Sequence, residues 1–399
     1  MTAVRQLVDA LQDTQSEREE LYRWLHQHPE LSMQERATSA RVEALLVEMG
    51  FECSTFATTG KVGVLDNGPG PTVMVRADMD ALPIAENTGL DYAADPAAGR
   101  GHMCGHDMHM AALLGAARSF ADNRDEWSGT FIALFQPGEE AGGGAAAMVA
   151  DGLADALPTP DVVLGQHVLP IDPPLGFGTI AGRMTTAASN WKVTIHGRGG
   201  HGSSPETAID PVVIAASVIT RLQTIVARES NPHEPTVVTV GTVHGGQSTN
   251  SIPDSVELGI NTRAVSDEAT TRIVEKLKRI VRAECAAGGA EEDPEFELLD
   301  SVPPIINDDE ATATVHAALR DHFGDAEVAA LEPMGISEDF AILPYAFGAP
   351  YCFWGWSGFS AGAHGPSNHS SEFGPQLQPT LDRGTAAIIV AALAWLKKG

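Results

Sequence analysis

The sequence predicts an α/β protein in which a large domain with a mostly parallel central sheet is interrupted by a small α+β domain. From residue 18 to about residue 182, helical patterns alternate with short apolar strands, which is typical of a parallel sheet covered by helices. From residue 187 the order becomes strand, helix, two strands and helix. The length of 399 residues is enough for two to three domains.

We expect the large domain to comprise residues 1–185 and 298–399, and the inserted domain to comprise residues 186–297. Segment 293–302 is expected to cross back to the large sheet. In the inserted domain, alternating apolar residues predict strands, and apolar residues at helical spacing predict helices. These elements are expected at 191–196 (strand), 210–228 (helix), 236–240 and 256–260 (strands) and 269–287 (helix).

Polar side chains follow three apolar strands of the large domain. Asp78 follows strand 72–75, the pair Glu139 and Glu140 follows strand 131–135, and His167 follows strand 162–164. Sites in open α/β sheets form beyond the carboxyl ends of the strands, so these side chains are expected to lie together. Neighbouring side chains of an extended segment point to opposite sides. One of the two glutamates can therefore bind a metal while the other faces a substrate.

The sequence Cys104-Gly105-His106 places a thiol and an imidazole two residues apart, before a predicted helix. The glycine lets the backbone bend so that both side chains can converge on one metal ion. Thiolate and imidazole together suit zinc or a similar late divalent ion. The alternative is a loop with surface histidines and a buried free cysteine.

The chain has four cysteines, and no pair of them has the spacing of a disulfide framework. Cys53, Cys285 and Cys352 lie among apolar or helical residues and are interpreted as core residues. Cys104 alone has neighbours that are expected to lower its pKa.

The composition is strongly acidic, with 53 Asp and Glu against 25 Lys and Arg and a net charge of -28. This charge repels nucleic acid and anionic membranes, so neither is an expected partner. No apolar stretch is expected to span a bilayer, and the longest, 385–396, is assigned to an amphipathic terminal helix. Residues 1–13 lack an apolar signal core, which predicts a cytoplasmic protein.

Eight short motifs make the chain similar to the M20 metallopeptidases, and within that family to the amidohydrolase branch, its subfamily D. They lie at 26–32, 76–83, 102–107, 136–140, 199–205, 250–253, 337–340 and 368–370. They occur in family order over essentially the whole chain. The chain resembles most the bacterial aminoacylases that act on N-acyl amino acids, including N-acyl-glutamine. The resemblance implies a zinc-peptidase-like large domain and an inserted lid and dimerisation domain.

The resemblance also implies two divalent metal ions per subunit, with zinc expected first and manganese, cobalt or nickel as alternatives. The positions that match the family's ligands are Cys104, His106, Glu140, His167 and His369. Near the C-terminus two histidines compete for the last ligand position. Residues 368–373 fit the family pattern around His369, apart from a serine in place of a proline, whereas His364 lacks that context.

Three positions match the family's catalytic residues. Glu139 matches the general base, and Asp78 matches an acid that orients the metal ligands. The chain has Arg76-Ala77-Asp78 where many relatives have a His-x-Asp motif, so the role of Asp78 rests on the wider family. His201 matches a histidine that crosses a dimer to stabilise the tetrahedral oxygen. The alternative for His201 is a turn histidine among flexible glycines.

The substrate's free carboxylate needs a cation or several amide donors. Asn250 and Arg263 occupy positions that the family uses for that end, although Arg263 could equally form a surface ion pair. We therefore expect a homodimer or homotetramer that hydrolyses the amide bond of small N-acyl amino acids with a metal-activated water. The runner-up substrate class is dipeptides or carboxypeptidase substrates.

Two hypotheses from other classes stay open. The first is a cysteine hydrolase with Cys104 as nucleophile and His106 or His109 as base, although a pair two residues apart in a glycine-rich loop gives poor geometry for this. The second is a non-catalytic metal-binding scaffold. The presence of both Glu139 and Glu140 disfavours the scaffold, because a pure binder needs no base.

Overall fold

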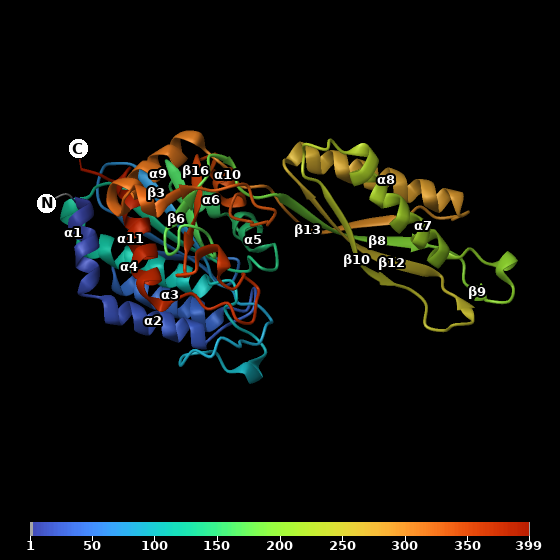
Figure 1. Cartoon of the computed structure of the whole chain (residues 1–399), viewed down its shortest axis with the longest axis horizontal. Coiled ribbons are helices and arrows are strands. Elements are labelled where there is room, and N and C mark those ends of the chain that lie inside the picture. The colour runs from blue at the N-terminus through green and yellow to red at the C-terminus, as the bar shows by residue number, and fades with distance from the viewer. Residues whose placement is uncertain (1–2, 399) are drawn as a thin grey trace. The chain divides into compact units, whose positions relative to one another are not determined.

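The computed structural model describes residues 3–398 and divides them into two compact units (Figure 1). The first unit runs from the N-terminus to Met184, then comprises Ile306–Pro333 and the chain from Asp339 onward. The second unit is Thr185–Ile305 with the short segment Met334–Glu338. The insertion begins next to the expected residue 186, but the chain returns to the first unit at 306 rather than 298.

The first unit is built on an eight-stranded sheet with the order β1-β2-β4-β3-β5-β16-β6-β15. Its central strands β4, β3, β5 and β16 are parallel to one another, while β1 and β2 add an antiparallel edge. The predicted mostly parallel sheet is confirmed. The strands are β1 (Glu52–Phe56), β2 (Gly60–Asp66), β3 (Thr72–Asp78), β4 (Thr130–Gln136), β5 (Val162–Leu169), β6 (Phe177–Thr179), β15 (Val328–Ala330) and β16 (Tyr351–Ser357); β7 (Gly182–Arg183) and β14 (Ile306–Asn307) form a separate pair.

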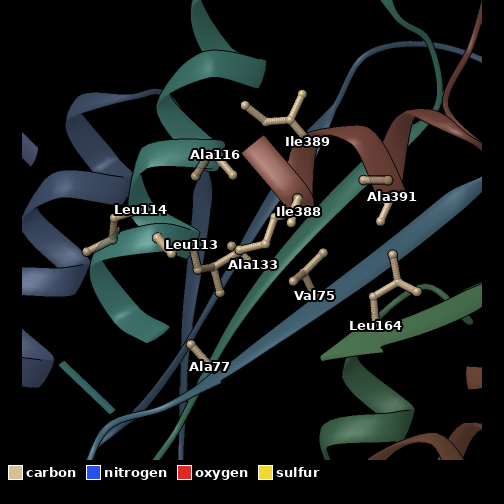
Figure 2. Close-up of a cluster of buried hydrophobic side chains, with 14 of the residues drawn as sticks. Val75, Ala77, Leu113, Leu114, Ala116, Ala133, Leu164, Ile388, Ile389 and Ala391 are labelled. Atoms are coloured by element: carbon tan, nitrogen blue, oxygen red, sulfur yellow. The ribbon is translucent and has the colours of Figure 1, made fainter. Parts of the chain in front are cut away.

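Helices cover this sheet because its strands are apolar on both faces. In Figure 2 the side chains of Leu113 and Ile388, from helices α4 and α11, lie against Val75 and Ala133 of the central strands. The helices of the unit are α1 (Ala3–Asp9), α2 (Gln15–Gln27), α3 (Arg36–Glu48), α4 (His106–Asp122), α5 (Gly144–Ala150), α6 (Leu153–Ala156), α9 (Asp309–Phe323), α10 (Ile342–Phe347) and α11 (Leu377–Leu393). The expectation of an amphipathic terminal helix is wrong, since every residue from 384 to 393 is buried.

The second unit is an antiparallel four-stranded sheet, in the order β10-β12-β8-β13, packed against helices α7 and α8. Its elements are β8 (Ala187–His196), β9 (Gly200–His201), α7 (Pro211–Thr224), β10 (Val237–His244), β11 (Ser251–Ile252), β12 (Ser255–Ala264), α8 (Asp267–Ala287) and β13 (Glu295–Val302). The expected crossing of 293–302 to the large sheet is wrong. Instead β13 pairs with β8, whose second edge would otherwise leave its backbone hydrogen-bonding groups without partners.

One helical stretch, Pro211–Glu229, is long and apolar enough to cross a membrane by length and composition alone. This differs from the expectation that no segment passes that test. Core helices of soluble proteins also pass it, and α7 packs Ile214, Val218 and Leu222 into the core of the second unit. Val212 and Val213 lie on the exposed side of the same helix.

Candidate metal centre

The loop that carries Cys104 and His106 is shaped by the glycine between them. Gly105 has a φ of +86°, and a Cβ at this position would lie 2.3 Å from Val168 Cγ1. Only glycine adopts this conformation in so little space without strain. The turn places Cys104 immediately before α4 and makes His106 the first residue of that helix.

The five predicted ligands come together in the first unit. Cys104 Sγ lies 3.5 Å from His167 Nε2 at the end of β5. His106 Nε2 lies 3.8 Å from Glu140 Oε1, and His369 Nε2 lies 3.2 Å from the same oxygen. Residues that are far apart in the sequence, from 104 to 369, therefore surround one small volume. The competing His364 lies on an exposed turn.

The backbone of His369 is itself held in an unusual conformation. Its φ is +67°, which is sparsely populated by residues other than glycine. Its N–H donates to the carbonyl of Met103 at 2.8 Å, and the side chain of Asn368 donates to the carbonyl of Cys104 at 3.2 Å. The C-terminal loop is thus fixed directly to the loop that carries Cys104. Residues in strained conformations cluster at functional sites, which agrees with this position.

The donor set fits a late divalent metal ion. Sulfur, imidazole nitrogen and carboxylate oxygen atoms of Cys104, His106 and Glu140 lie within 4.8 Å of one another. Among the residues described, His106 Nε2 is buried and makes no hydrogen bond. Buried polar atoms are rarely left without a partner, so this nitrogen is placed as a metal ligand would be. Thiolate and imidazole ligands suit zinc and its neighbours.

The electrostatics of these side chains are dominated by burial and by their mutual contacts. Burial lowers the pKa of His106, but Asp78 and Asp80 outweigh it and hold that pKa well above its usual value. Burial keeps the pKa of His167 well below its usual value. Contacts with Cys104 and Glu140 raise the pKa of His369 to about 10. The surroundings thus raise the pKa of His106 and His369 and lower that of His167.

The neighbours His106 and His369 lower the pKa of Cys104, as expected, but the net pKa of this thiol is raised. Burial raises the pKa of this thiol, and the opposing contacts with His106 and His369 do not compensate. A thiol removed from water loses the solvation that stabilises its thiolate form. The sequence shows which residues are close to Cys104 in the chain, but it does not show how deeply the thiol is buried.

Asp80 makes the contacts expected of an acid that orients the metal ligands. Its Oδ1 lies 3.3 Å from His106 Nδ1. Its two oxygens accept the backbone N–H groups of Glu139 at 3.1 Å and Glu140 at 3.0 Å, and also the Ser32 hydroxyl at 2.6 Å. A carboxylate behind a ligand histidine fixes its ring orientation and tautomer. Sequence reasoning missed Asp80, although it stands in the same 76–83 motif as Asp78.

Asp78 lies closer to Arg76 and His109 than to His106. Its carboxylate accepts from Arg76 Nη1 at 2.7 Å and from His109 Nδ1 at 2.5 Å, and it lies 3.6 Å from His106 Nε2. The other nitrogen of His109, Nε2, accepts the N–H of Val168 at 2.9 Å. Asp78, His106, His109 and His167 lie close enough to hold a metal. However, both nitrogens of His109 are already engaged, so His109 is interpreted as structural.

Glu139, the predicted base, lies beside the candidate ligands. Its Oε2 is 4.0 Å from His106 Nε2, and its side chain is 12% exposed. Glu140, the next residue, approaches both His106 and His369. Both carboxylates thus lie at similar distances from His106 Nε2, and the division of roles, in which one binds a metal while its neighbour faces substrate, stays a prediction.

The remaining predicted residues, His201, Asn250 and Arg263, belong to the second unit. His201 is exposed on β9, where its Nδ1 accepts from the Ser203 hydroxyl at 2.8 Å. The carbonyl of Asn250 accepts the N–H of Gly202 at 2.8 Å, so His201 and Asn250 both lie at the small two-stranded sheet of β9 and β11. Arg263 donates to the carbonyl of Gly335 at 3.0 Å, which is neither of the roles considered for it.

Known proteins share both the sequence and the fold. The profile of peptidase family M20/M25/M40 matches residues 74–388. An N-acetyl-L-cysteine deacetylase of Bacillus subtilis is 36% identical over 343 residues, which are 84% of this chain and 79% of that protein. A thermostable carboxypeptidase of Saccharolobus solfataricus is 34% identical over 361 residues, 89% of each chain.

Solved structures extend this likeness over the whole fold. A Staphylococcus aureus protein assigned as an aminohydrolase superposes with a TM-score of 0.89 at 33% identity, covering 98% of this chain and 100% of its own. A dinuclear metal-binding peptidase of Bacillus subtilis superposes with a TM-score of 0.77 at 27% identity, covering 96% of this chain and 100% of its own.

Proposed function

Because this chain belongs to peptidase family M20/M25/M40, we propose that it hydrolyses the amide bond of N-acyl amino acids with metal ions and a water molecule. The observation that carries the proposal is the convergence of Cys104, His106, Glu140, His167 and His369 beside the carboxylate of Glu139. Metal binding agrees with the similar Bacillus subtilis structure, which is that of a dinuclear metal-binding peptidase. Hydrolysis of small acylated amino acids agrees with the N-acetyl-L-cysteine deacetylase.

Two divalent ions held by these five residues would lower the pKa of a water molecule and polarise the substrate carbonyl. Glu139 takes a proton from the water as its oxygen bonds to the carbonyl carbon. It then gives that proton to the amide nitrogen as the C–N bond breaks. The products are a carboxylic acid and a free amino acid. Asp80 holds the backbone of Glu139 and Glu140 through both stages.

Carboxypeptidase action is the alternative within the family, since one relative is a thermostable carboxypeptidase. A dipeptide differs from its N-acetyl counterpart by a free amine and the charge on it. Comparing the two substrates in one assay separates these activities. We expect faster hydrolysis of the acylated compound, and faster cleavage of the free dipeptide would assign the enzyme to the peptidases.

Cysteine catalysis is the alternative of a different class. A reactive cysteine needs a lowered pKa and access to the substrate, whereas Cys104 is buried and its pKa is raised. Chelation separates the two mechanisms. We expect EDTA to abolish activity and Zn, Mn, Co or Ni to restore it. Activity that survives EDTA and is blocked by a thiol alkylator would favour Cys104 as nucleophile.

A homodimer formed through the second unit is also part of the proposal. The sheet has two edges that differ in charge. Edge strand β13 carries Glu295, Glu297 and Asp300, whereas β10 carries no Asp, Glu, Lys or Arg and exposes Val237 and Val243. Charged residues protect an edge from pairing, so β10 is the edge suited to a second copy.

Val243→Lys places a charge on this edge and is expected to shift the protein toward the monomer in light scattering. An unchanged mass would remove β10 from the interface. In a dimer, His201 of a second copy would serve as the oxyanion donor. Zinc as the native ion and a cytoplasmic location stay predictions.

A matched pair of variants tests the reaction itself. Glu139→Gln is expected to lower kcat about 10²- to 10⁴-fold while metal content stays at the wild-type value. Glu140→Gln is expected to lower metal content as well, because it removes a ligand. Equal metal loss in both variants would refute the division of roles. A metal-loaded wild type that hydrolyses no acylated amino acid or dipeptide would favour a metal-binding scaffold.

A further inference from the structure

Residues 30–35 lie directly against the candidate metal centre, although none of them is a predicted ligand or base. The carbonyl of Glu30 accepts the N–H of Ala81 at 2.8 Å, and Leu31 forms a parallel bridge with Ala81. Ser32 donates to Asp80 at 2.6 Å. The segment is therefore fixed along the end of β3, next to the acid that contacts His106.

Glu35 ends this segment with a completely buried carboxylate. Its Oε1 accepts two backbone N–H groups, from Met33 at 2.8 Å and from Gly138 at 2.9 Å. Its Oε2 accepts the Thr59 hydroxyl at 2.7 Å. Both oxygens are thus occupied, and the bond to Gly138 joins the N-terminal segment to the loop that carries Glu139 and Glu140.

That loop is a tight turn with little freedom of its own. Gly138 has a φ of +60°, and its carbonyl accepts the N–H of Gly144 at 3.1 Å. A Cβ on Gly144 would lie 1.5 Å from the carbonyl oxygen of Pro137. Backbone N–H groups buried in such a turn need acceptors, because an unpaired one costs free energy comparable to a lost hydrogen bond.

Three consecutive N–H groups of the loop are accepted by two carboxylates. Glu35 takes that of Gly138, and Asp80 takes those of Glu139 and Glu140. Asp80 also contacts His106, whereas Glu35 contacts none of the candidate ligands. The two anchors therefore differ. Asp80 couples the loop to a candidate ligand, and Glu35 determines where the loop begins.

We propose that Glu35 is a positioning residue that sets the direction of Glu139 by anchoring the N–H of Gly138. This inference rests on the proposed function, in which Glu139 moves the proton. Misplacing a reacting group by about 1 Å can cost about 10²-fold in rate. Release of this anchor is therefore expected to lower turnover without removing any group that touches metal or substrate.

Three variants separate positioning from folding. In Glu35→Gln, Oε1 still accepts the N–H groups of Met33 and Gly138, and the new amide donates to Thr59, whose hydroxyl can turn to accept. Glu35→Leu keeps similar bulk and accepts nothing. Thr59→Val removes the third bond of the same carboxylate and leaves Gly138 untouched.

We expect kcat to fall about 10- to 100-fold in Glu35→Leu with KM nearly unchanged. Glu35→Gln and Thr59→Val are expected to stay within about threefold.

Hydrogen exchange on the metal-free protein provides a readout that does not depend on activity. The amides of 138–144 are expected to exchange at least about tenfold faster in Glu35→Leu and at the wild-type rate in Glu35→Gln. If Glu35→Leu does not fold, Glu35→Met replaces it. Methionine keeps the length of the side chain but has no carboxylate oxygen to accept the N–H of Gly138, so faster loop exchange is again expected.

Several outcomes would overturn the inference. One is that Glu35→Leu keeps the wild-type kcat and the wild-type exchange rate of the loop amides. Another is that Glu35→Gln lowers kcat and speeds loop exchange as much as Glu35→Leu does. Unchanged loop exchange in Glu35→Met would overturn it as well. The proposed function fails separately, if metal-loaded wild type hydrolyses no acylated amino acid. In that case the exchange experiment still determines whether Glu35 anchors the loop.

Discussion

The two units bury different kinds of side chain. The core of the second unit is almost entirely aliphatic, and in the described part of the chain its one buried carboxylate is Glu338. The first unit has a larger apolar core and in addition buries Arg76, Asp78, Asp80 and His106, along with other ionisable groups. Burial of charge costs free energy unless each charge has a partner.

The buried residues of the second unit therefore stabilise the fold, whereas those of the first unit also form the candidate metal centre. The second unit has a core that packing alone explains. The first unit uses long-range ion pairs and hydrogen bonds to hold charged groups that a purely structural core would avoid. Strongly perturbed pKa values cluster at functional sites, and here they cluster in the first unit. One pair of variants compares the two units, and three further pairs test the charged and metal-binding groups of the first unit.

The largest effect is expected from two buried cysteines, one in each unit. Cys104→Ser should lower metal content and turnover by at least about 100-fold, because a hydroxyl is a poor replacement for a thiolate ligand. Cys285→Ser, in the aliphatic core of the second unit, should leave metal content unchanged. Elemental analysis and an acyl amino acid assay measure both quantities. Full metal content in Cys104→Ser would remove Cys104 from the ligand set.

The buried ion pairs of Arg76 provide the next test. Arg76→Met leaves Asp78 and Asp339 without their cation, and should lower the free energy of unfolding by about 3–5 kcal/mol. Arg5→Met, which breaks an exposed pair with Asp9, should cost at most about 1 kcal/mol. Both are measured by denaturant unfolding of metal-free protein in a Trp191→Phe background, where tryptophan fluorescence reports the first unit. An equal loss of unfolding free energy in Arg76→Met and Arg5→Met would show that the buried ion pairs add no more stability than the exposed one.

The contacts of His26 predict that the free energy of unfolding depends on pH. Burial lowers its pKa, but contacts with Asp107 and Glu86 outweigh it and raise that pKa to about 10. Because the folded-state pKa exceeds the unfolded value of about 6.5, this stabilisation is complete below pH 6.5 and is lost as pH rises through about 10. His26→Asn should therefore be destabilised most near pH 6, on the order of 2 kcal/mol, and less near pH 10.

Chemical unfolding of metal-free protein across this pH range measures the effect. His28→Asn, at an exposed position two residues away, is the control and should follow the wild type. A destabilisation of His26→Asn that is independent of pH would indicate lost packing rather than a lost charge.

The smallest effect is expected from the histidine that was not assigned as a ligand. His364→Ala alters an exposed turn and should change turnover and metal content by no more than about twofold. His369→Ala should behave like the loss of a ligand. Metal titration of both variants measures the difference, and the reverse result would show that the two assignments should be exchanged.

The fold class and most of the candidate ligands could be predicted from residue patterns and motifs. Apolar strands ending in Asp78, Glu139 and His167 predicted one edge of a parallel sheet, because the carboxyl ends of such strands meet. The turn at Gly105 followed from the one residue that tolerates its backbone conformation. These features depend on local pattern and residue type, which the sequence states directly.

The partners that surround each side chain became known from the three-dimensional fold. It brought Asp80 to His106 and to the backbone of Glu139, raised the pKa of Cys104, and paired β13 with β8. It also directed Glu35 to Gly138, more than a hundred residues along the chain. The physical reason is that burial and hydrogen bonding are set by neighbours in space, and residues distant in the chain supply most of them.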